Sequence, residues 1–293
     1  MPAKCALIAT LGTEPQVVTA GLDLLLDRQE PVSRVEVIHT GGNATIEQAV
    51  ETLRTAFAMP PYRDRITLDL TPIQDRNGRI VSDVETPSAI QWAFRVLYRS
   101  VWRAKQNGER LHLLLAGGRK TLSVFALVTA QLLFDKEDAL WHLYSAGEFL
   151  ASRRLHPQPG DEVHLIPIPV PLREALSPAL THLRGIEDPY EALAHLQRLD
   201  LEKRTREAQI FVENVLTWGE RRVVERLVRE GLSDAALAQT LHLSQRTVEQ
   251  HLRSAYSKAA VHWGLEDVNR AQLVALLGLY FQYQQDKNTG KPS

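Results

Sequence analysis

The chain has 293 residues, 44% of them hydrophobic, so it can form one large domain or two medium ones with a sizeable core. Its formal net charge is −1 at pH 7, so any surface that binds nucleic acid must be local. Cys5 is the only cysteine, which excludes an intramolecular disulfide and a zinc site built on cysteines. The histidines lack the paired spacing of metal ligands, and we expect neither a metal nor a cofactor.

No apolar run approaches the ~20 residues that a membrane-spanning helix needs. The first ten residues predict a strand and lack the charged segment and long apolar run of a secretory signal. We therefore expect a cytoplasmic protein without a membrane partner.

Residues 1–171 alternate between strand and helix patterns. Short apolar runs predict strands at 5–10, 35–39, 66–70, 111–116, 140–145 and 163–168. Amphipathic windows predict helices at 16–26, 45–58, 88–105 and 121–134. This alternation predicts an α/β domain, a Rossmann-like, mostly parallel sheet with helices on both faces. The prolines at 169 and 171 end it, and 172–215 predicts a helical linker broken near Gly185 and Pro189.

Two glycine-bearing turns follow the first and fourth predicted strands. Residues 11–16 read Leu-Gly-Thr-Glu-Pro-Gln, and residues 117–120 read Gly-Gly-Arg-Lys. In the common doubly wound order these two strands are neighbours, and the ligand crevice opens outside their carboxyl ends. The sequence therefore predicts that both turns line one crevice. The simpler alternative is that each is an ordinary strand-to-helix turn.

The second turn suits a phosphate. Its glycines remove side chains where the backbone must approach a ligand, and the helix that follows presents N–H groups with a partial positive charge. An arginine and a lysine add full positive charge at the same place. We expect ligand contacts from both turns and from the end of the second strand. The candidate residues are Gly12, Thr13, Glu14, Gln16, Gly41, Asn43, Gly117, Gly118, Arg119, Lys120 and Thr121.

Residues 216–283 change to a pattern of short helices, and 284–293 are expected to form a flexible tail. Capping residues bound the predicted helices: Gly231, Ser233, Ser244, Asn269 and Gln272. Two of these helices are joined by a short link at 241–244, which predicts a helix-turn-helix.

In such a unit the second helix enters the DNA major groove, N-terminal residues first. Here Val248 and Leu252 of that helix face the core. Arginine and glutamine can bond base edges, and threonine and arginine can bond phosphates. The expected contacts to double-stranded DNA are Ser244, Gln245, Arg246, Thr247, Gln250, His251 and Arg253.

Charge limits how this helical region could bind DNA. Residues 216–283 hold eight Lys or Arg against seven Asp or Glu, a net charge of +1. That is a weak electrostatic footprint for a monomer, so a dimer that reads two half-sites would be needed. The alternative is a helical interaction module that touches no DNA.

Residues 218–277 resemble the LuxR/GerE type of DNA-binding domain. The resemblance is carried by Glu220-Arg221-Arg222-Val223-Val224, Glu230-Gly231-Leu232-Ser233, Ala236-Leu237-Ala238, Leu243-Ser244-Gln245-Arg246-Thr247-Val248-Glu249-Gln250-His251-Leu252 and Asn269-Arg270-Ala271-Gln272-Leu273-Val274. Two departures are Ala236, where a Lys or Arg often stands, and a longer stretch at 261–268. The resemblance implies a transcriptional regulator.

The N-terminal half resembles the CARF family, the CRISPR-associated Rossmann-fold sensors, in particular its ring-nuclease-like branch. The motifs are Ala9-Thr10-Leu11-Gly12-Thr13-Glu14-Pro15-Gln16-Val17-Val18-Thr19 and Gly117-Gly118-Arg119-Lys120-Thr121. The resemblance implies a homodimer that binds a cyclic oligoadenylate, above all cyclic tetra-adenylate, across its two-fold axis. A two-fold symmetric ligand suits a two-fold symmetric dimer.

Some relatives cleave the ring without a metal, by attack of a ribose 2′-hydroxyl on the adjacent phosphate while a lysine stabilises the developing charge. Carried over, Lys120 is that lysine, and Thr13 supplies a hydroxyl. Glu14 stands where the family often has serine. Because a carboxylate repels phosphate, this departure favours sensing over cleavage.

The sequence therefore favours a cyclic-oligoadenylate sensor that controls a DNA-binding helix-turn-helix. The alternative is an enzyme, a metal-independent ring nuclease that ends the antiviral signal. A third hypothesis is a Rossmann-like nucleotide sensor outside CRISPR defence.

Overall fold

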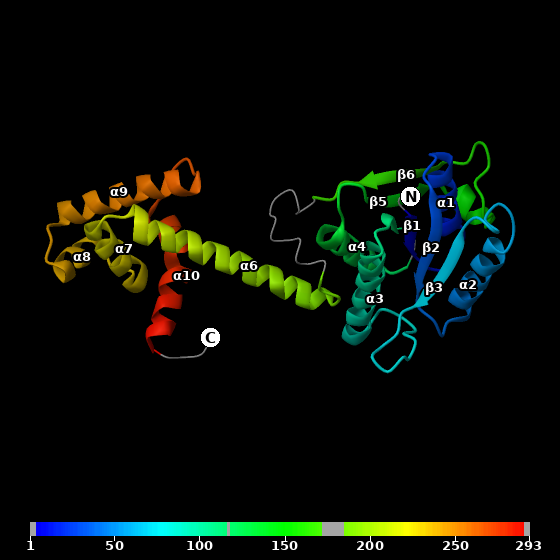
Figure 1. The fold of residues 1–293 in the computed structure, drawn as a ribbon, viewed down its shortest axis with the longest axis horizontal. Helices are drawn as coiled ribbons and strands as arrows, with labels where there is room; N and C mark the ends of the chain where they lie inside the picture. The colour runs from blue at the N-terminus through cyan, green and yellow to red at the C-terminus, as the bar shows by residue number, and fades with distance from the viewer. Residues whose placement is uncertain (1–3, 116–117, 172–184, 290–293) are drawn as a thin grey trace. The chain divides into compact units, whose positions relative to one another are not determined.

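A computed structural model of the chain describes residues 4–115, 118–171 and 185–289 (Figure 1). The chain divides into two compact units, Met1–His195 and Leu196–Ser293. The second unit therefore begins within the predicted linker, ahead of residue 216. The physical reason is burial, because Phe211 and Val212 belong to the core of the second unit.

The first unit is built on one six-stranded sheet. Its strands are β1 (Cys5–Thr10), β2 (Val32–His39), β3 (Thr67–Pro72), β4 (Arg110–Leu115), β5 (Ala139–Ser145) and β6 (Val163–Ile168). Their order is β3-β2-β1-β4-β5-β6. The first five strands are parallel, and β6 runs antiparallel to β5. The mostly parallel α/β fold expected from the sequence is confirmed.

Helices cover the sheet on both faces. They are α1 (Gln16–Asp27), α2 (Ala44–Phe57), α3 (Pro87–Gln106), α4 (Lys120–Leu133) and the short α5 (Gly147–Ser152). Helices α1 and α2 lie on one side of the strands, and α3 and α4 lie on the other (Figure 1). β1 is buried along its whole length, as expected of a central strand whose two faces are both covered.

One short helix was not expected from the sequence. Helix α5 has six residues, too few for a periodic pattern to stand out, and it lies between β5 and β6. Its side chain at Phe149 is buried in the main core of the unit. β6 then returns beside β5, which gives the parallel sheet one antiparallel edge strand.

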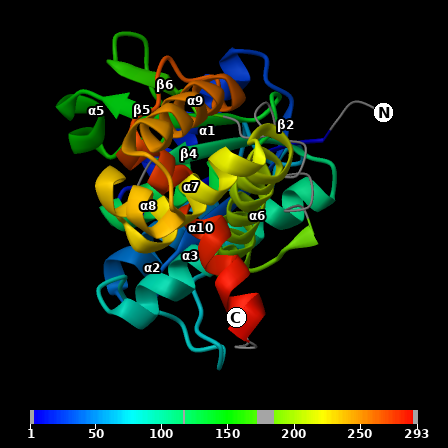
Figure 2. The same ribbon diagram turned by 90° about the vertical axis from the view of Figure 1, so that its left-hand side faces the viewer.

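The second unit is helical. Helix α6 (Pro189–Ile210) crosses the boundary between the units and leads into the short π-helix η3 (Phe211–Val215). The helices that follow are α7 (Trp218–Glu230), α8 (Asp234–Leu241), α9 (Gln245–Trp263) and α10 (Arg270–Thr289), which gather into one cluster (Figure 2). Helix α10 extends through 284–289, where a tail was expected. Residues 172–184 of the predicted linker lie outside the described part.

The predicted helix ends are present in this unit. The Ser233 and Ser244 hydroxyls accept hydrogen bonds from Ala236 N and Thr247 N. Gly231 is the C-cap of α7, in the left-handed conformation that glycine adopts without strain. The capping box is formed by Asn269 and Gln272, whose side chains accept from each other's backbone N–H at 3.0 and 2.8 Å.

A buried carboxylate ties α7 to α9. Glu220 accepts hydrogen bonds from Lys258 Nζ at 2.6 Å, from Ser254 Oγ at 2.7 Å and from the backbone N–H of Thr217 at 2.7 Å. Burial alone would raise the pKa of Glu220, but these bonds outweigh it and lower the pKa to about 2 from the ordinary 4.5. The charged form of Glu220 is therefore part of the folded unit.

We expect Glu220→Gln to destabilise the second unit by about 2 kcal/mol, because Lys258 loses its charged partner. Since the folded pKa lies below the unfolded one, the contribution of Glu220 is present above about pH 4.5 and is lost as the pH falls toward 2. Calorimetric unfolding of the full chain across this range should show the pH dependence flattened in the variant.

The matched control is Glu225→Gln, which removes a more exposed carboxylate of α7 paired with Arg229. An exposed pair of this kind contributes about 0.5 kcal/mol. If both variants unfold alike at neutral pH, the Glu220 network does not hold α7 against α9.

Candidate functional site

The turns that follow β1 and β4 lie against each other at the carboxyl edge of the sheet, because the two strands pair in parallel. Gly118 has φ +93°, and a Cβ there would lie 3.0 Å from Leu122 Cδ1 and 3.5 Å from the carbonyl oxygen of Leu11. The positive φ at 118 favours glycine, and the 3.5 Å distance places the two turns within van der Waals contact of each other. The predicted convergence of the two turns is present. Gly117 lies outside the described residues.

Lys120 is the first residue of α4, with its side chain exposed. Among the residues that the structure describes, it has no hydrogen-bond or ion-pair partner. The first turn of a helix also carries N–H groups without acceptors inside the helix. Half-buried Thr121 follows in the same turn. The ammonium group and the start of α4 can therefore act together on an anion.

Arg119, in contrast, is already paired. Its Nε donates to Asp83 Oδ1 at 2.8 Å, and its Nη2 donates to the second Asp83 oxygen and to Glu85 Oε1. The hydrogen bond from Arg119 lowers the pKa of Asp83 below its ordinary value. Sequence analysis did not find these two acids. Their one sequence signal is their place in the loop after β3, whose end lies at the same sheet edge.

Gln16 fixes the turn that follows β1. This side chain is buried, and its Nε2 donates to Glu14 Oε2 at 2.5 Å and to the carbonyl oxygen of Leu150 at 3.3 Å. Gln16, expected to contact ligand, therefore positions the Glu14 carboxylate and ties the turn to α5. Thr13 is exposed and Gly12 half-buried beside it.

Gly41 and Asn43 both have structural roles at the end of β2. A Cβ at Gly41 would lie 2.5 Å from Ile80 Cγ2, and the Gly41 N–H donates to the carbonyl oxygen of Val81 at 3.0 Å. Asn43 is the N-cap of α2, and its side chain accepts from Thr45 N at 2.9 Å. The exposed Asn43 still lies at the sheet edge expected to contact ligand.

The charged side chains of the two turns and the acids that contact Arg119 carry more negative than positive charge. The cations are Arg119 and Lys120, and the carboxylates are Glu14, Asp83 and Glu85. Since Arg119 is neutralised by its acid partners, Lys120 is the one unpaired cation among the described site residues. An anionic ligand must therefore rely on Lys120 and the start of α4, or exchange places with the acids on Arg119.

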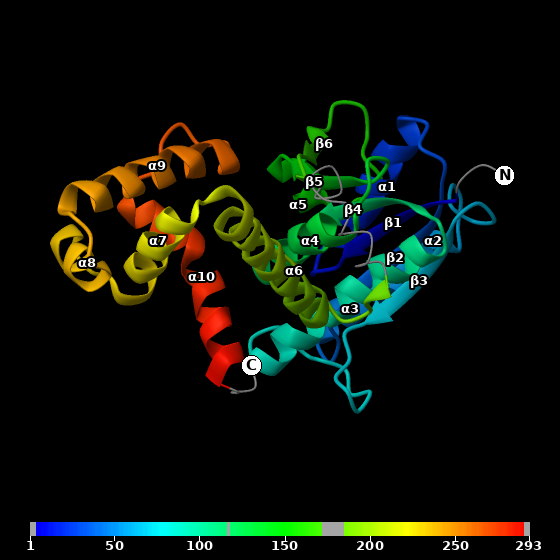
Figure 3. The same ribbon diagram turned by 60° about the vertical axis from the view of Figure 1, so that its left-hand side comes forward.

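The exposed face of α9 presents three of the predicted DNA contacts. Arg246, Gln250 and Arg253 are exposed, and their spacing by four and then three residues places them on one face of the helix. Helix α9 is the long orange helix of Figure 3. The Ser244 and Thr247 hydroxyls are 2.7 Å apart within the cap. The remaining polar side chain of the first turn, Gln245, donates to Glu249 at 3.1 Å.

His251 differs from these residues because it packs against α7. A Cβ at Gly219 would lie 2.9 Å from His251 Cε1, so glycine leaves room for the ring. Near Gly219, the guanidinium carbon of Arg222 lies 4.6 Å from the centre of the Trp218 ring. His251 therefore supports the contact between α7 and α9 and is only half exposed.

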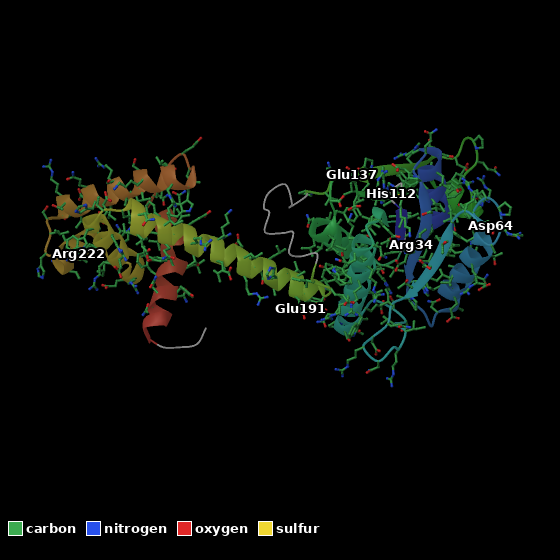
Figure 4. All side chains as sticks on the ribbon, viewed as in Figure 1. Arg34, Asp64, His112, Glu137, Glu191 and Arg222 are labelled. Carbon is green, nitrogen blue, oxygen red and sulfur yellow. The ribbon has the colours of Figure 1, made fainter. Side chains whose placement is uncertain are left out.

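A hollow of about 870 Å³ lies along the outer strand β3, apart from the two glycine turns. Arg34 of β2, labelled in Figure 4, is among the residues that line it. This side chain pairs with Glu109 at 2.6 Å, Glu36 at 3.0 Å and Asp69 at 3.2 Å. Ser100 Oγ donates to Glu36 at 2.6 Å. These polar groups satisfy one another and join β2 and β3 to α3, which is a structural role.

Within the described ranges, no group of three or more His, Cys, Asp or Glu side chains could hold a metal ion. The helices of those ranges include none that is long and apolar enough to cross a membrane.

Comparison with known proteins assigns the chain to a family. The family described as CRISPR-associated protein NE0113 (Cas_NE0113) matches residues 14–201. The match includes the Glu14 end of the first turn, the loop with Asp83 and Glu85, and the turn with Arg119 and Lys120. No curated protein matches the chain. Because the match covers more than half of the 293 residues, the chain belongs to the CRISPR-associated NE0113 family.

Proposed function

We propose that this protein senses a cyclic oligoadenylate and in response controls a DNA-binding helix-turn-helix. The observation that carries the proposal is the packed pair of turns after β1 and β4, with Lys120 at the start of α4 and no partner for it among the described residues. A helix N-terminus with an adjacent lysine suits a phosphodiester. Membership in a CRISPR-associated family supports this class of sensor over a nucleotide sensor outside CRISPR defence.

The proposed ligand is cyclic tetra-adenylate, bound by a homodimer. A two-fold symmetric ring presents equivalent phosphates to two copies of one site. Each copy then uses Lys120 once, so that a single substitution removes two contacts from the complex.

DNA binding is proposed for α9. Arg246, Gln250 and Arg253 share one exposed face, and their side chains can reach base edges and phosphates. The low positive charge of the region argues for binding as a dimer at two half-sites. If this face has no affinity for duplex DNA, the helical region is instead an interaction module that does not bind DNA.

A ring nuclease is the second candidate function. Exposed Thr13 and exposed Lys120 lie on the two turns that meet at Gly118. Lysine and helix N–H groups can stabilise negative charge that develops on a phosphate. Against cleavage stands the Glu14 carboxylate, an acceptor-only group that Gln16 holds in the first turn.

We expect Lys120→Ala to weaken binding of cyclic tetra-adenylate by well over tenfold. A charge-assisted contact contributes about 1.5–3 kcal/mol, and a dimer uses two. Isothermal calorimetry measures the affinity, and the melting temperature of the free protein should stay unchanged because Lys120 is exposed. Lys136→Ala, an exposed lysine elsewhere in the first unit, is the control. Equal affinities of the two variants would remove Lys120 from the site.

We expect Arg246→Ala to reduce DNA affinity by roughly 1–3 kcal/mol, the cost of one lost base contact. Gel shifts with DNA upstream of the protein's own operon, with and without cyclic tetra-adenylate, measure this effect. Arg204→Ala removes an exposed arginine of α6 and should leave binding unchanged. If the unsubstituted protein prefers this DNA to random duplex in neither state, α9 does not read DNA.

Ring cleavage is expected to be slow or absent because of Glu14. Single-turnover assays with cyclic tetra-adenylate, followed by chromatography, should show no linear product over hours despite tight binding. Product within minutes that Lys120→Ala abolishes would instead make the ring nuclease the primary function. In that case, loss of activity in Glu14→Gln would identify Glu14 as a general base.

A further inference from the structure

The loop between β3 and α3, residues 73–86, reaches across the carboxyl edge to the proposed ligand site. Its first part is fixed to the end of β2: Ile73 N donates to His39 O at 2.7 Å, and Val81 N donates to Ile73 O at 2.8 Å. The Gly41 N–H donates to Val81 O at 3.0 Å. The loop is thus anchored by backbone bonds up to residue 81.

The second part of the loop is fixed at its other end by α3. Thr86 caps this helix by accepting from Ala89 N at 3.2 Å. Between the two anchors, Val84 is buried, and its N–H donates to Asp83 Oδ1 at 2.7 Å. Asp83 is therefore held by its own loop as well as by Arg119. Residues 82–85 present two carboxylates to one guanidinium from a defined position.

The contacts on Arg119 are those that a phosphate would use. A guanidinium binds carboxylate and phosphate with the same planar donors, so the two kinds of anion compete for it. Asp83 takes the Nε and Nη2 donors of Arg119, and Glu85 shares Nη2. All three side chains are 43–64% exposed, so the pairing is reversible and does not hold the core together.

We propose that Asp83 and Glu85 are specificity-determining residues of the site: they occupy Arg119 in the free protein, and a phosphodiester of the ligand displaces them. The inference rests on the proposed function, and it names the residues that decide which anions can bind at the site. An anion that reaches only Lys120 leaves Asp83 and Glu85 on Arg119 and is repelled by the net negative charge of these three groups. A ring that engages Lys120 and Arg119 together replaces the acids and frees residues 82–85. Ligand binding thereby releases residues 82–85 from their contact with Arg119.

A double-mutant cycle tests the exchange. The four full-length proteins are the unsubstituted chain, Arg119→Ala, the acid-free variant Asp83→Asn with Glu85→Gln, and the triple variant. Calorimetric titration with cyclic tetra-adenylate should show about tenfold tighter binding by the acid-free variant, because two like charges near the phosphate are gone. Loss of Arg119 should cost less than about threefold in the unsubstituted chain and more than about tenfold in the acid-free background.

The matched control removes two exposed carboxylates elsewhere in the first unit, Glu51→Gln with Asp64→Asn. This variant has the same net charge as the acid-free variant and should bind like the unsubstituted chain. Independent, additive effects of Arg119 and of the acid pair would overturn the proposal. So would equal gains in affinity from the acid-free variant and the control.

A readout without ligand separates this inference from the proposed function. Hydrogen–deuterium exchange of the free protein over residues 82–86 should be at least about threefold faster in Arg119→Ala, since the loop loses its partner. Unchanged exchange would overturn the role of Arg119 in holding the loop. If Arg119→Ala speeds exchange while no variant binds cyclic tetra-adenylate, the loop contact stands and the proposed ligand fails.

Discussion

The parallel pairing of β1 with β4 determines where the chemistry of the first unit can lie. Their carboxyl ends meet at one edge of the sheet, and the turns that follow must share the space outside it. Gly118 adopts the positive φ of the second turn, and a Cβ there would lie in van der Waals contact with the Leu11 carbonyl. A single close approach of two backbones thus brings Thr13, Glu14, Arg119 and Lys120 into one neighbourhood.

The charge balance of that neighbourhood is unlike a simple phosphate cradle. A cradle gathers cations and N–H groups, whereas this edge also gathers three carboxylates. Each carboxylate has a partner: Glu14 is held by Gln16, and Asp83 and Glu85 by Arg119. Such a site favours a ligand large enough to satisfy several groups at once, because a small anion gains one contact and meets the repulsion of the acids.

The second unit depends on a different constraint, a buried carboxylate paired with a half-buried lysine. Glu220 joins α7 to α9 through Lys258 and Ser254 and closes the N-terminal cap of α7 at Thr217. Because the carboxylate is satisfied on several sides, its charge can be kept in a buried place. The close contact of Gly219 with His251 adds to the same helix pair. These contacts pack one face of α9 against α7 and leave the face with Arg246, Gln250 and Arg253 exposed.

The sequence by itself determined which strands and long helices form, and at which edge of the sheet the two glycine-bearing turns lie. β1 and β6 begin and end where predicted, and the other strands and the four long helices of the first unit lie within a few residues of their expected bounds. Periodicity and caps act over a few neighbouring residues, so they can be recognised without tertiary contacts. The short α5 was missed because six residues hold less than two turns of periodic pattern.

Only the tertiary structure decided which candidate side chains are free. Arg119 and Lys120 are neighbours with similar charge, yet one is bound by acids 36 and 34 residues away and the other is unpaired among the described residues. Gln16, which the sequence predicts to contact the ligand, is buried and donates to Glu14. These outcomes depend on loops that approach from distant parts of the chain. Local sequence patterns do not predict such contacts, because periodicity relates only residues that are close together in the sequence.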